Sequence, residues 1–251
     1  SMKQKYSNKE VLSPGTVIIS ATAHTDNIRN SVEPFLQNNK SNLYYINMSS
    51  CEYELGGSAL FQANNKIGEK CNDVKSAKDF KNIFNTIQDC IKNGLIYSGH
   101  DISSGGLITC LLEMCFVSDN IGMNIDLSNI DEKNIIKLLF SENHGIVFQS
   151  TTEIEKYLNQ SKIIYHKIGK SMIGDKIIIK KDNFSKVLDI KKYREKWFEK
   201  SYDLDKIQSG KLKARERFEK LRQPGLKFKF PDWFNSKFNF IPKNKIKAAI
   251  I

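Results

Sequence analysis

The sequence feature that most constrains the fold is the stretch from Ser98 to Leu107, which reads SGHDISSGGL. The apolar run 94–97 before it is typical of a short buried strand, and the apolar residues of 107–114 recur at helical spacing. The order is therefore strand, polar glycine-rich turn beginning at Ser98, and helix. Such a turn directs backbone N–H groups and the positive end of a helix outward, which suits a phosphate group. Asp101 adds a hard oxygen ligand of the kind that Mg²⁺ prefers.

The same residues also have purely structural explanations. Asp and Ser are common helix caps, so Asp101 and Ser103 would serve equally well to begin the helix. His100 fits a structural hydrogen bond as well as it fits chemistry. A second glycine pair, in Gly56-Gly57-Ser58, also precedes an apolar run. It fits either a phosphate-contacting turn or a simple tight turn.

Strands and helices alternate on both sides of this central stretch. β-branched or alternating residues predict further strands at 16–23, 43–47, 122–127, 145–149, 162–166 and 176–180. Apolar residues at helical spacing predict helices over 79–91, 107–114 and 131–140. We expect a short helix capped by Asp26, and another at 152–158 opened by a capping box of Thr152 and Glu155. The mixed order predicts an α+β fold, a mixed β-sheet flanked by helices.

Changes in composition predict the domain organisation. The polar loop 37–42 is the first internal boundary, and the character changes again from Ser185. There a long helix and, after Gly210, a second helix are followed by an aromatic, Pro-punctuated stretch. Residues 245–251 begin a core-type strand. The resulting segments are 1–40, 41–190, a helical and irregular linker over 191–244, and 245–251.

The net charge of +11 raises the hypothesis of a basic nucleic-acid-binding or interaction module. Only five of the 39 basic residues are Arg, the residue favoured for bidentate contacts with phosphates and bases. Much of the excess lies between Lys191 and Arg222, a pattern that favours a solvated or docking surface. Nucleic-acid binding therefore remains the alternative hypothesis.

The five cysteines are odd in number and include no C-x-x-C pair, which favours free thiols in a reducing cytoplasm over a zinc site. No run approaches the roughly 18 apolar residues that a membrane span needs, so we expect no membrane association. The N-terminus lacks the apolar region of a secretory signal.

Several stretches, in the same order, resemble the large multidomain phosphoribosylformylglycinamidine (FGAM) synthases of purine biosynthesis. Leu55–Leu60 is similar to the family's Leu-Gly-Gly-Ser-Ala-Leu segment. His100–Leu107 is similar to its His-Asp-x-Ser-Asp-Gly-Gly-Leu signature, and Trp197–Gln208 is similar to a segment that leads to the glutaminase domain. That last segment argues against a third hypothesis, a related kinase or selenophosphate-type synthetase, because those enzymes lack a glutaminase linker.

The resemblance implies that the chain is a piece of such a synthase. Residues 1–40 would end the second N-terminal-type domain, 41–190 would form a domain like the C-terminal domain of aminoimidazole ribonucleotide (AIR) synthetase, and 245–251 would begin the glutaminase. The whole enzyme would use ATP and glutamine to convert formylglycinamide ribonucleotide to FGAM, with ADP, phosphate and glutamate as products. The piece alone is expected to be inactive and to hold no catalytic residue. Its partners would be the remaining domains of the synthase, with a homodimer of the fragment as a further expectation.

The resemblance also assigns site residues. Asp101 aligns with a Mg²⁺ ligand and Ser103 with a residue that contacts the nucleotide, ATP or ADP. Gly105 and Gly106 complete the nucleotide-binding signature, and supporting roles fall to His100 and to Gly56-Gly57-Ser58. Ser104 departs from the family, which has Asp there, and the missing carboxylate weakens a cation site or its surroundings.

Overall fold

The structure, a computed structural model, describes residues 3–12, 17–25, 27–39 and 41–220. The chain divides into two compact units, Ser1–Arg194 and Glu195–Ile251. The first unit contains the site residues expected from the sequence, and the second consists, where it is described, of helices.

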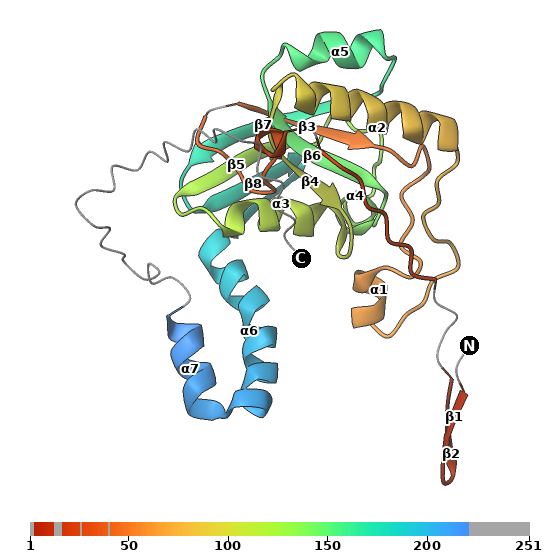
Figure 1. The fold of residues 1–251 in the computed structure, drawn as a ribbon, viewed down its shortest axis with the longest axis vertical. Helices are drawn as coiled ribbons and strands as arrows, with labels where there is room; N and C mark the ends of the chain where they lie inside the picture. The colour runs from red at the N-terminus through yellow and green to blue at the C-terminus, as the bar shows by residue number, and fades with distance from the viewer. Residues whose placement is uncertain (1–2, 13–16, 26, 40, 221–251) are drawn as a thin grey trace, which may run out of the picture. The chain divides into compact units, whose positions relative to one another are not determined.

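A seven-stranded mixed sheet forms the centre of the first unit (Figure 1). Its strands are β3 (Asn42–Asn47), β4 (Ile96–Ile102), β5 (Ile121–Asp126), β6 (Gly145–Ser150), β7 (His166–Ile173), β8 (Lys176–Lys181) and β9 (Phe184–Asp189). They lie in the order β4-β6-β3-β7-β5-β8-β9, and every neighbouring pair is antiparallel except β5 and β8. A separate hairpin pairs β1 (Lys3–Tyr6) with β2 (Lys9–Leu12).

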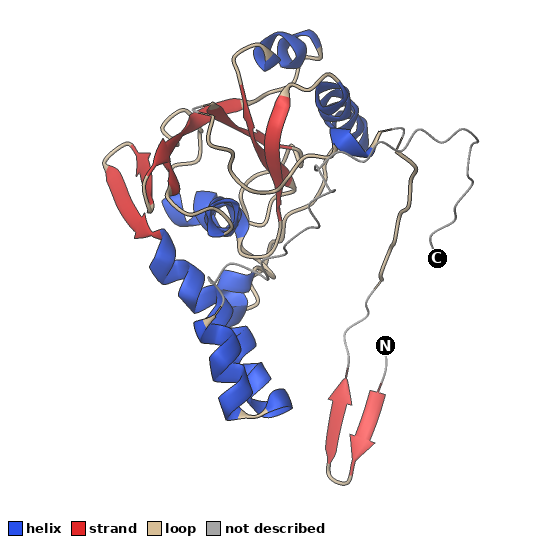
Figure 2. Cartoon of the chain, turned by 60° about the vertical axis from the view of Figure 1, so that its left-hand side comes forward, coloured by secondary structure: helices blue, strands red, loops and turns tan. Residues whose placement is uncertain are grey.

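Helices cover both faces of this sheet, as Figures 1 and 2 show. Those of the first unit are the 3₁₀ turn η1 (Ile28–Asn30), α1 (Ala59–Ala63), α2 (Ala77–Lys92), α3 (Gly106–Phe116), α4 (Ile135–Phe140) and α5 (Ile154–Gln160). Buried residues of α2 and α5 share one apolar cluster with β3, β4 and β6. Those of α3 and α4 share the other cluster, which extends across the whole sheet to β9.

The inner strand β3 shows why two helical layers are needed. Successive side chains of a strand point to opposite faces. Leu43 and Tyr45 accordingly enter the α3–α4 cluster, while Tyr44 and Ile46 enter the α2–α5 cluster, and all four are at most 1% exposed. Burying each such side chain contributes about 1.5–3 kcal/mol. A strand that is apolar on both faces is therefore stable only with a helix on each side.

The predicted fold class is confirmed: a mixed sheet flanked by helices is followed by further helices. The strands predicted at 43–47, 122–127, 145–149 and 176–180 and the helices predicted at 79–91 and 107–114 are present, with ends shifted by a few residues. The helix predicted over 131–140 is shorter, because Asn134 caps it with its side chain at Ile136 and Lys137.

The central turn differs from the prediction. Strand β4 does not end at residue 97 but continues through Ser98, His100 and Asp101 to Ile102. The polar Ser98 is tolerated inside the sheet because its hydroxyl donates to Gln149 Oε1 at 2.7 Å. The prediction that the turn begins at Ser98 is therefore wrong, and the turn is confined to residues 103–105.

Two predicted elements near the N-terminus also differ. Within the strand predicted at 16–23, the described residues 17–23 form no strand, and Val17, Ile18 and Ile19 are 85–87% exposed. β-Branched residues favour a strand only where a neighbouring strand completes the ladder. Asp26, the predicted cap, lies outside the described residues. The side chain of Asn27 accepts a hydrogen bond from Arg29 N and begins η1 instead.

Further differences lie in the second half of the sheet. The capping box predicted at Thr152 and Glu155 is absent, because the Glu155 carboxylate accepts the Tyr44 hydroxyl at 2.7 Å instead. The strand predicted at 162–166 begins only at His166, and the edge strand β9 was not predicted.

In the second unit, the described residues form a helical hairpin. Helix α6 (Ile190–Ser209), which starts in the first unit, and α7 (Lys211–Glu219) are joined at Gly210, whose φ is +84°. The rings of Tyr202 and Phe218 stack at 4.7 Å, and Arg217 forms an ion pair with Asp205. The predicted helices of the linker are thus present, whereas residues 221–251 lie outside the described part. No helix in that part is long and apolar enough to cross a membrane.

Candidate functional site

The turn between β4 and α3 depends on its two glycines. Gly105 and Gly106 have φ values of +90° and +74°, which side chains disfavour. Gly106 N donates to Ser103 O at 3.0 Å and closes the turn. A Cβ atom on Gly106 would lie 2.7 Å from the carbonyl carbon of Phe140. The turn therefore packs directly against the end of α4, and only glycine fits.

Asp101, Ser103 and Ser104 are exposed around this turn. The Asp101 side chain is 72% accessible and lies at the end of β4, one residue before the buried Ile102. The N-cap of α3 is Gly105, which has no side chain. The capping explanation for Asp101 and Ser103 is therefore excluded, and both polar groups face solvent next to a helix N-terminus.

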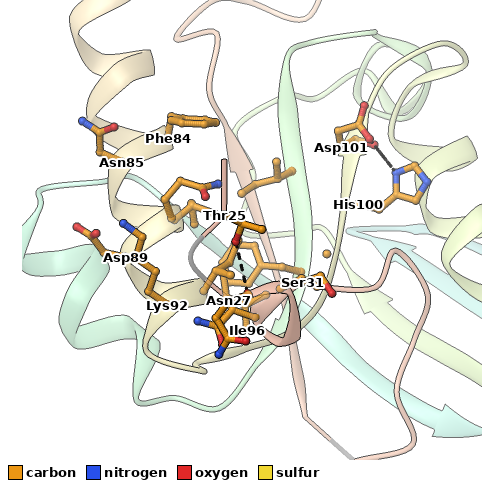
Figure 3. A pocket seen from close by; sticks show the side chains of 18 of the residues that line it. Thr25, Asn27, Ser31, Phe84, Asn85, Asp89, Lys92, Ile96, His100 and Asp101 are labelled. Atoms are coloured by element: carbon orange, nitrogen blue, oxygen red, sulfur yellow. Dashed lines mark hydrogen bonds and ion pairs between the residues drawn. The ribbon is translucent and has the colours of Figure 1, made fainter. Parts of the chain in front are cut away.

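His100 is held beside Asp101 and α3. Its Nδ1 lies 2.7 Å from the Asp101 carbonyl oxygen, and because a carbonyl only accepts, Nδ1 carries the proton. Its Nε2 lies 3.4 Å from Glu113 Oε2. The same Nδ1 lies 3.4 Å from Asp101 Oδ1 (Figure 3). This environment gives His100 a structural partner on each side.

The second glycine loop, Gly56-Gly57-Ser58, forms a tight turn into α1. The Ser58 hydroxyl donates to Leu55 O at 2.6 Å and accepts from Phe61 N at 3.4 Å, so it caps the helix. A Cβ atom on Gly56 would lie 2.2 Å from Lys70 O. The loop is thus fixed by its own contacts, and the buried Ser58 side chain is already hydrogen-bonded.

One residue that the sequence reasoning did not single out joins the two glycine loops. The Oε1 atom of Glu142 accepts from Gly105 N at 2.8 Å and from Ala59 N at 2.7 Å. The turn after β4 and the start of α1 therefore meet at one carboxylate oxygen. Its only sequence signal is that Leu139–Glu142, together with Gly145–Val147, also resembles a segment of the FGAM synthases.

A pocket of about 1040 Å³ between β4 and α2 is lined in part by His100 and Asp101 (Figure 3). Its opposite wall is the α2 surface that carries Phe84, Asn85 and Lys92. Residues of the segments 24–25 and 27–32 form a third wall. The pocket is thus open to the end of β4, where the exposed Asp101 lies.

The residues that could hold a cation are few. Among the described residues, no three His, Cys, Asp or Glu side chains are grouped so that they could bind a metal ion. Asp101 offers a single exposed carboxylate, and Ser104 supplies none. The described residues alone therefore do not make a Mg²⁺ site, although the Asp101 carboxylate, which lies 3.4 Å from His100 Nδ1, is exposed enough to supply one ligand to a larger one.

Burial makes the neighbouring thiol unsuitable for chemistry. The sulfur of Cys110 on α3 lies 3.8 Å from the His100 carbonyl oxygen. Burial, with the nearby Asp101 and Glu113 charges, raises the pKa of Cys110 well above its usual value. This thiol therefore stays protonated and serves packing.

Comparison with known proteins shows which proteins this chain is similar to. Residues 48–171, from the end of β3 into β7, match the family model described as AIR synthase related protein, C-terminal domain. The chain is 31% identical to a probable phosphoribosylformylglycinamidine synthase, chloroplastic/mitochondrial, of Arabidopsis thaliana, over 97% of this chain and 17% of that protein. It is 29% identical to the phosphoribosylformylglycinamidine synthase of Homo sapiens, over 89% of this chain and 17% of that protein.

Solved structures share the fold. Thermotoga maritima PurL complexed with FGAR aligns with a TM-score of 0.52 at 12% identity, over 66% of this chain and 30% of that one. The same protein complexed with ATP aligns with a TM-score of 0.50 at 10% identity, over 65% and 27% of the two chains. At such identities the alignment shows the fold alone. Together, the comparisons confirm the resemblance to FGAM synthases, of whose length this chain spans less than one fifth.

Proposed function

We propose that this chain, which resembles FGAM synthases over nearly its whole length, is one part of such a synthase. The whole enzyme would be an ATP-dependent ligase that makes FGAM from formylglycinamide ribonucleotide and glutamine. This part would contribute to a Mg²⁺–nucleotide site and to packing between domains. The residues that carry the chemical steps would lie outside it.

The observation that carries the proposal is the exposed polar edge of the β4–α3 turn. Asp101 and Ser103 face solvent beside the start of an eleven-residue helix, and neither caps that helix. The positive end of the α3 dipole favours a negatively charged phosphate there. In the proposed site, Ser103 contacts a phosphate of ATP or ADP and Asp101 supplies one ligand to Mg²⁺, with other ligands from elsewhere in the enzyme.

The glycines have a different role in this proposal. The N–H groups of Gly105 and Gly106 already bond to Glu142 and Ser103. Gly105 and Gly106 therefore act by letting the backbone turn tightly and approach the nucleotide, rather than through their own amides. His100 and the loop Gly56-Gly57-Ser58 support the turn from either side.

The proposed organisation follows the family. Residues 1–40 complete a preceding domain, 41–190 form the domain of the AIR synthetase C-terminal type, 191–244 lead on, and 245–251 begin the glutaminase. The partners are then the other domains of the same enzyme, the setting is the cytoplasm, and an isolated piece would self-associate through surfaces meant for its neighbours.

Activity tests this proposal most simply in a full-length enzyme that contains the chain. We expect glutamine- and ATP-dependent formation of FGAM from formylglycinamide ribonucleotide. A full-length enzyme with an intact glutaminase but no such activity would contradict the proposal.

The alternative, a nucleic-acid-binding module, has weaker support. Six of the eleven basic residues between 191 and 220 form ion pairs with carboxylates, among them Lys191–Asp175, Lys206–Asp203, Arg215–Glu219 and Arg217–Asp205. Such pairing reduces the charge available to a phosphate backbone. Steeply salt-dependent binding of the chain to generic DNA or RNA would favour this alternative.

A further inference from the structure

We propose that Glu142 is a positioning residue that locks the two glycine loops of the site to each other, so that the turn bearing Ser103 keeps the shape needed for a nucleotide. This inference rests on the proposed nucleotide role of that turn. Glu142 would act through the backbone of Gly105 and Ala59 rather than by touching the nucleotide.

The first step is the chemistry of the shared contact. Gly105 is the N-cap of α3 and Ala59 is the first residue of α1, so their N–H groups have no partner within their own helices. Both donate to Glu142 Oε1, at 2.8 Å and 2.7 Å. Hydrogen bonds from an N–H to a carboxylate are stronger than neutral ones, and a negative charge is favoured at the start of a helix.

The second step is the rigidity of the segment that carries Glu142. The preceding Ser141 ends α4, and its hydroxyl lies within hydrogen-bonding distance of Glu54 O and of the side chains of Asn72 and Asn143. On the other side, Gly106 packs against the backbone of residues 139 and 140. The carboxylate is thus held on a fixed segment between the loop 52–59 and the β4–α3 turn.

The third step concerns how far apart in the sequence the segments joined by Glu142 lie. Gly105 and Ala59 lie 37 and 83 residues from Glu142 in the sequence, and this single oxygen joins them. Removing the carboxylate would leave two donors of the loops without their acceptor. The turn would then open toward water, and Ser103, two residues before Gly105, would lose its fixed position.

Amide hydrogen exchange on this chain tests the lock directly. In Glu142→Leu we expect exchange at Gly105 and Ala59 to accelerate by about tenfold or more, because a hydrogen bond to a charged acceptor is lost at each. Glu142→Gln keeps a carbonyl oxygen at the same reach and should restore most of the protection. Glu132→Leu is the matched control, because Glu132 also accepts a backbone N–H, from Asn134, but lies outside the glycine loops.

A second variant covers the case in which Glu142→Leu does not fold. Glu142→Asp keeps the charge but is one methylene shorter, so it cannot hold both donors, and at least one of the two amides should lose protection. Unchanged protection of both amides in Glu142→Leu or in Glu142→Asp overturns the lock.

The affinity for Mg·ADP then distinguishes a failure of the positioning role from a failure of the proposed function. In the full-length enzyme we expect Glu142→Leu to weaken Mg·ADP binding by about tenfold or more, Glu142→Gln to restore it, and Glu132→Leu to leave it unchanged. Equal affinity of the wild type and Glu142→Leu overturns the positioning role alone. No binding of Mg·ADP by the wild type overturns the proposed function, and the positioning role with it, whatever the exchange result.

Discussion

Gly106 offers a sharp test of how closely the β4–α3 turn packs against α4. In Gly106→Ala the new Cβ would lie 2.7 Å from the carbonyl carbon of Phe140 and 2.8 Å from Leu139 O, both backbone atoms that cannot rotate away. Gly94→Ala is the matched control. Gly94 also has a positive φ, +69°, but nothing lies within 4 Å of its added Cβ.

The expected magnitudes follow from these two environments. A side chain in the left-handed region costs about 1–2 kcal/mol, and this strain acts in both variants. Overpacking a close contact adds about 1–3 kcal/mol, and this acts only in Gly106→Ala. We therefore expect the free energy of unfolding to fall by about 1–2 kcal/mol in Gly94→Ala and by about 2–5 kcal/mol in Gly106→Ala.

Denaturant titration followed by far-ultraviolet circular dichroism measures both values, and both glycines belong to the same unit, Ser1–Arg194. The difference between the variants isolates the contact with α4. Equal losses of stability would refute the reasoning, because the turn would then not be pressed against the end of α4.

Three further outcomes test other parts of the structure. Lys181→Met should lower the free energy of unfolding by about 2 kcal/mol, since it removes the hydrogen bonds from the buried ammonium to Leu127 O and Ile130 O; an unchanged denaturation midpoint would contradict this role. Burial lowers the pKa of His166 below 6.5. As the pH falls, this histidine therefore takes up a proton in the unfolded chain before it does so in the folded chain, and the free energy of unfolding decreases below about pH 6.5. His166→Gln should flatten that fall in urea titrations at pH 7 and 5, whereas His24→Gln, at an exposed position, should leave it in place. Exposed Cys71 should react with a thiol reagent in the native chain before Cys115, because burial raises the pKa of Cys115 to about 12; reaction in the opposite order would show that α3 opens readily.

The parts of the fold that the sequence predicted correctly are those with a strong local pattern. Helix α2 is predicted from apolar residues at helical spacing, Phe80, Ile83, Phe84, Ile87 and Ile91. Its Ile83 and Ile87 are indeed buried, whereas Phe84 is 51% exposed. The run at 43–47, which is apolar except for its last residue, predicts the buried strand β3. Such elements show their buried face within their own sequence, so no knowledge of distant partners is needed.

The elements that were missed depend on partners far away in the chain. Ser98 looked like the start of a turn, but Gln149 satisfies its hydroxyl inside the sheet, so β4 continues. Val17–Ile19 looked like a strand, but no neighbouring strand pairs with them in the described part of the chain. Glu155 fitted a capping box, yet its carboxylate bonds Tyr44.

The candidate site shows the same division. The glycine-rich turn and its exposed Asp101 and Ser103 were visible in the sequence, and the structure places them beside the N-terminus of α3. Glu142 was not visible as a site residue, because its two donors lie on other loops. Local patterns therefore identified the turn but not the residue that holds it.

Mg·ADP retention by the full-length enzyme with Asp101→Ala tests the central claim most directly. Asp101 would supply one metal ligand, so we expect the substitution to weaken retention by about tenfold or more, while Asp131→Ala, at another exposed Asp, leaves it unchanged. Equal retention by Asp101→Ala and the wild type would contradict the claim that the β4–α3 turn forms part of a Mg²⁺–nucleotide site.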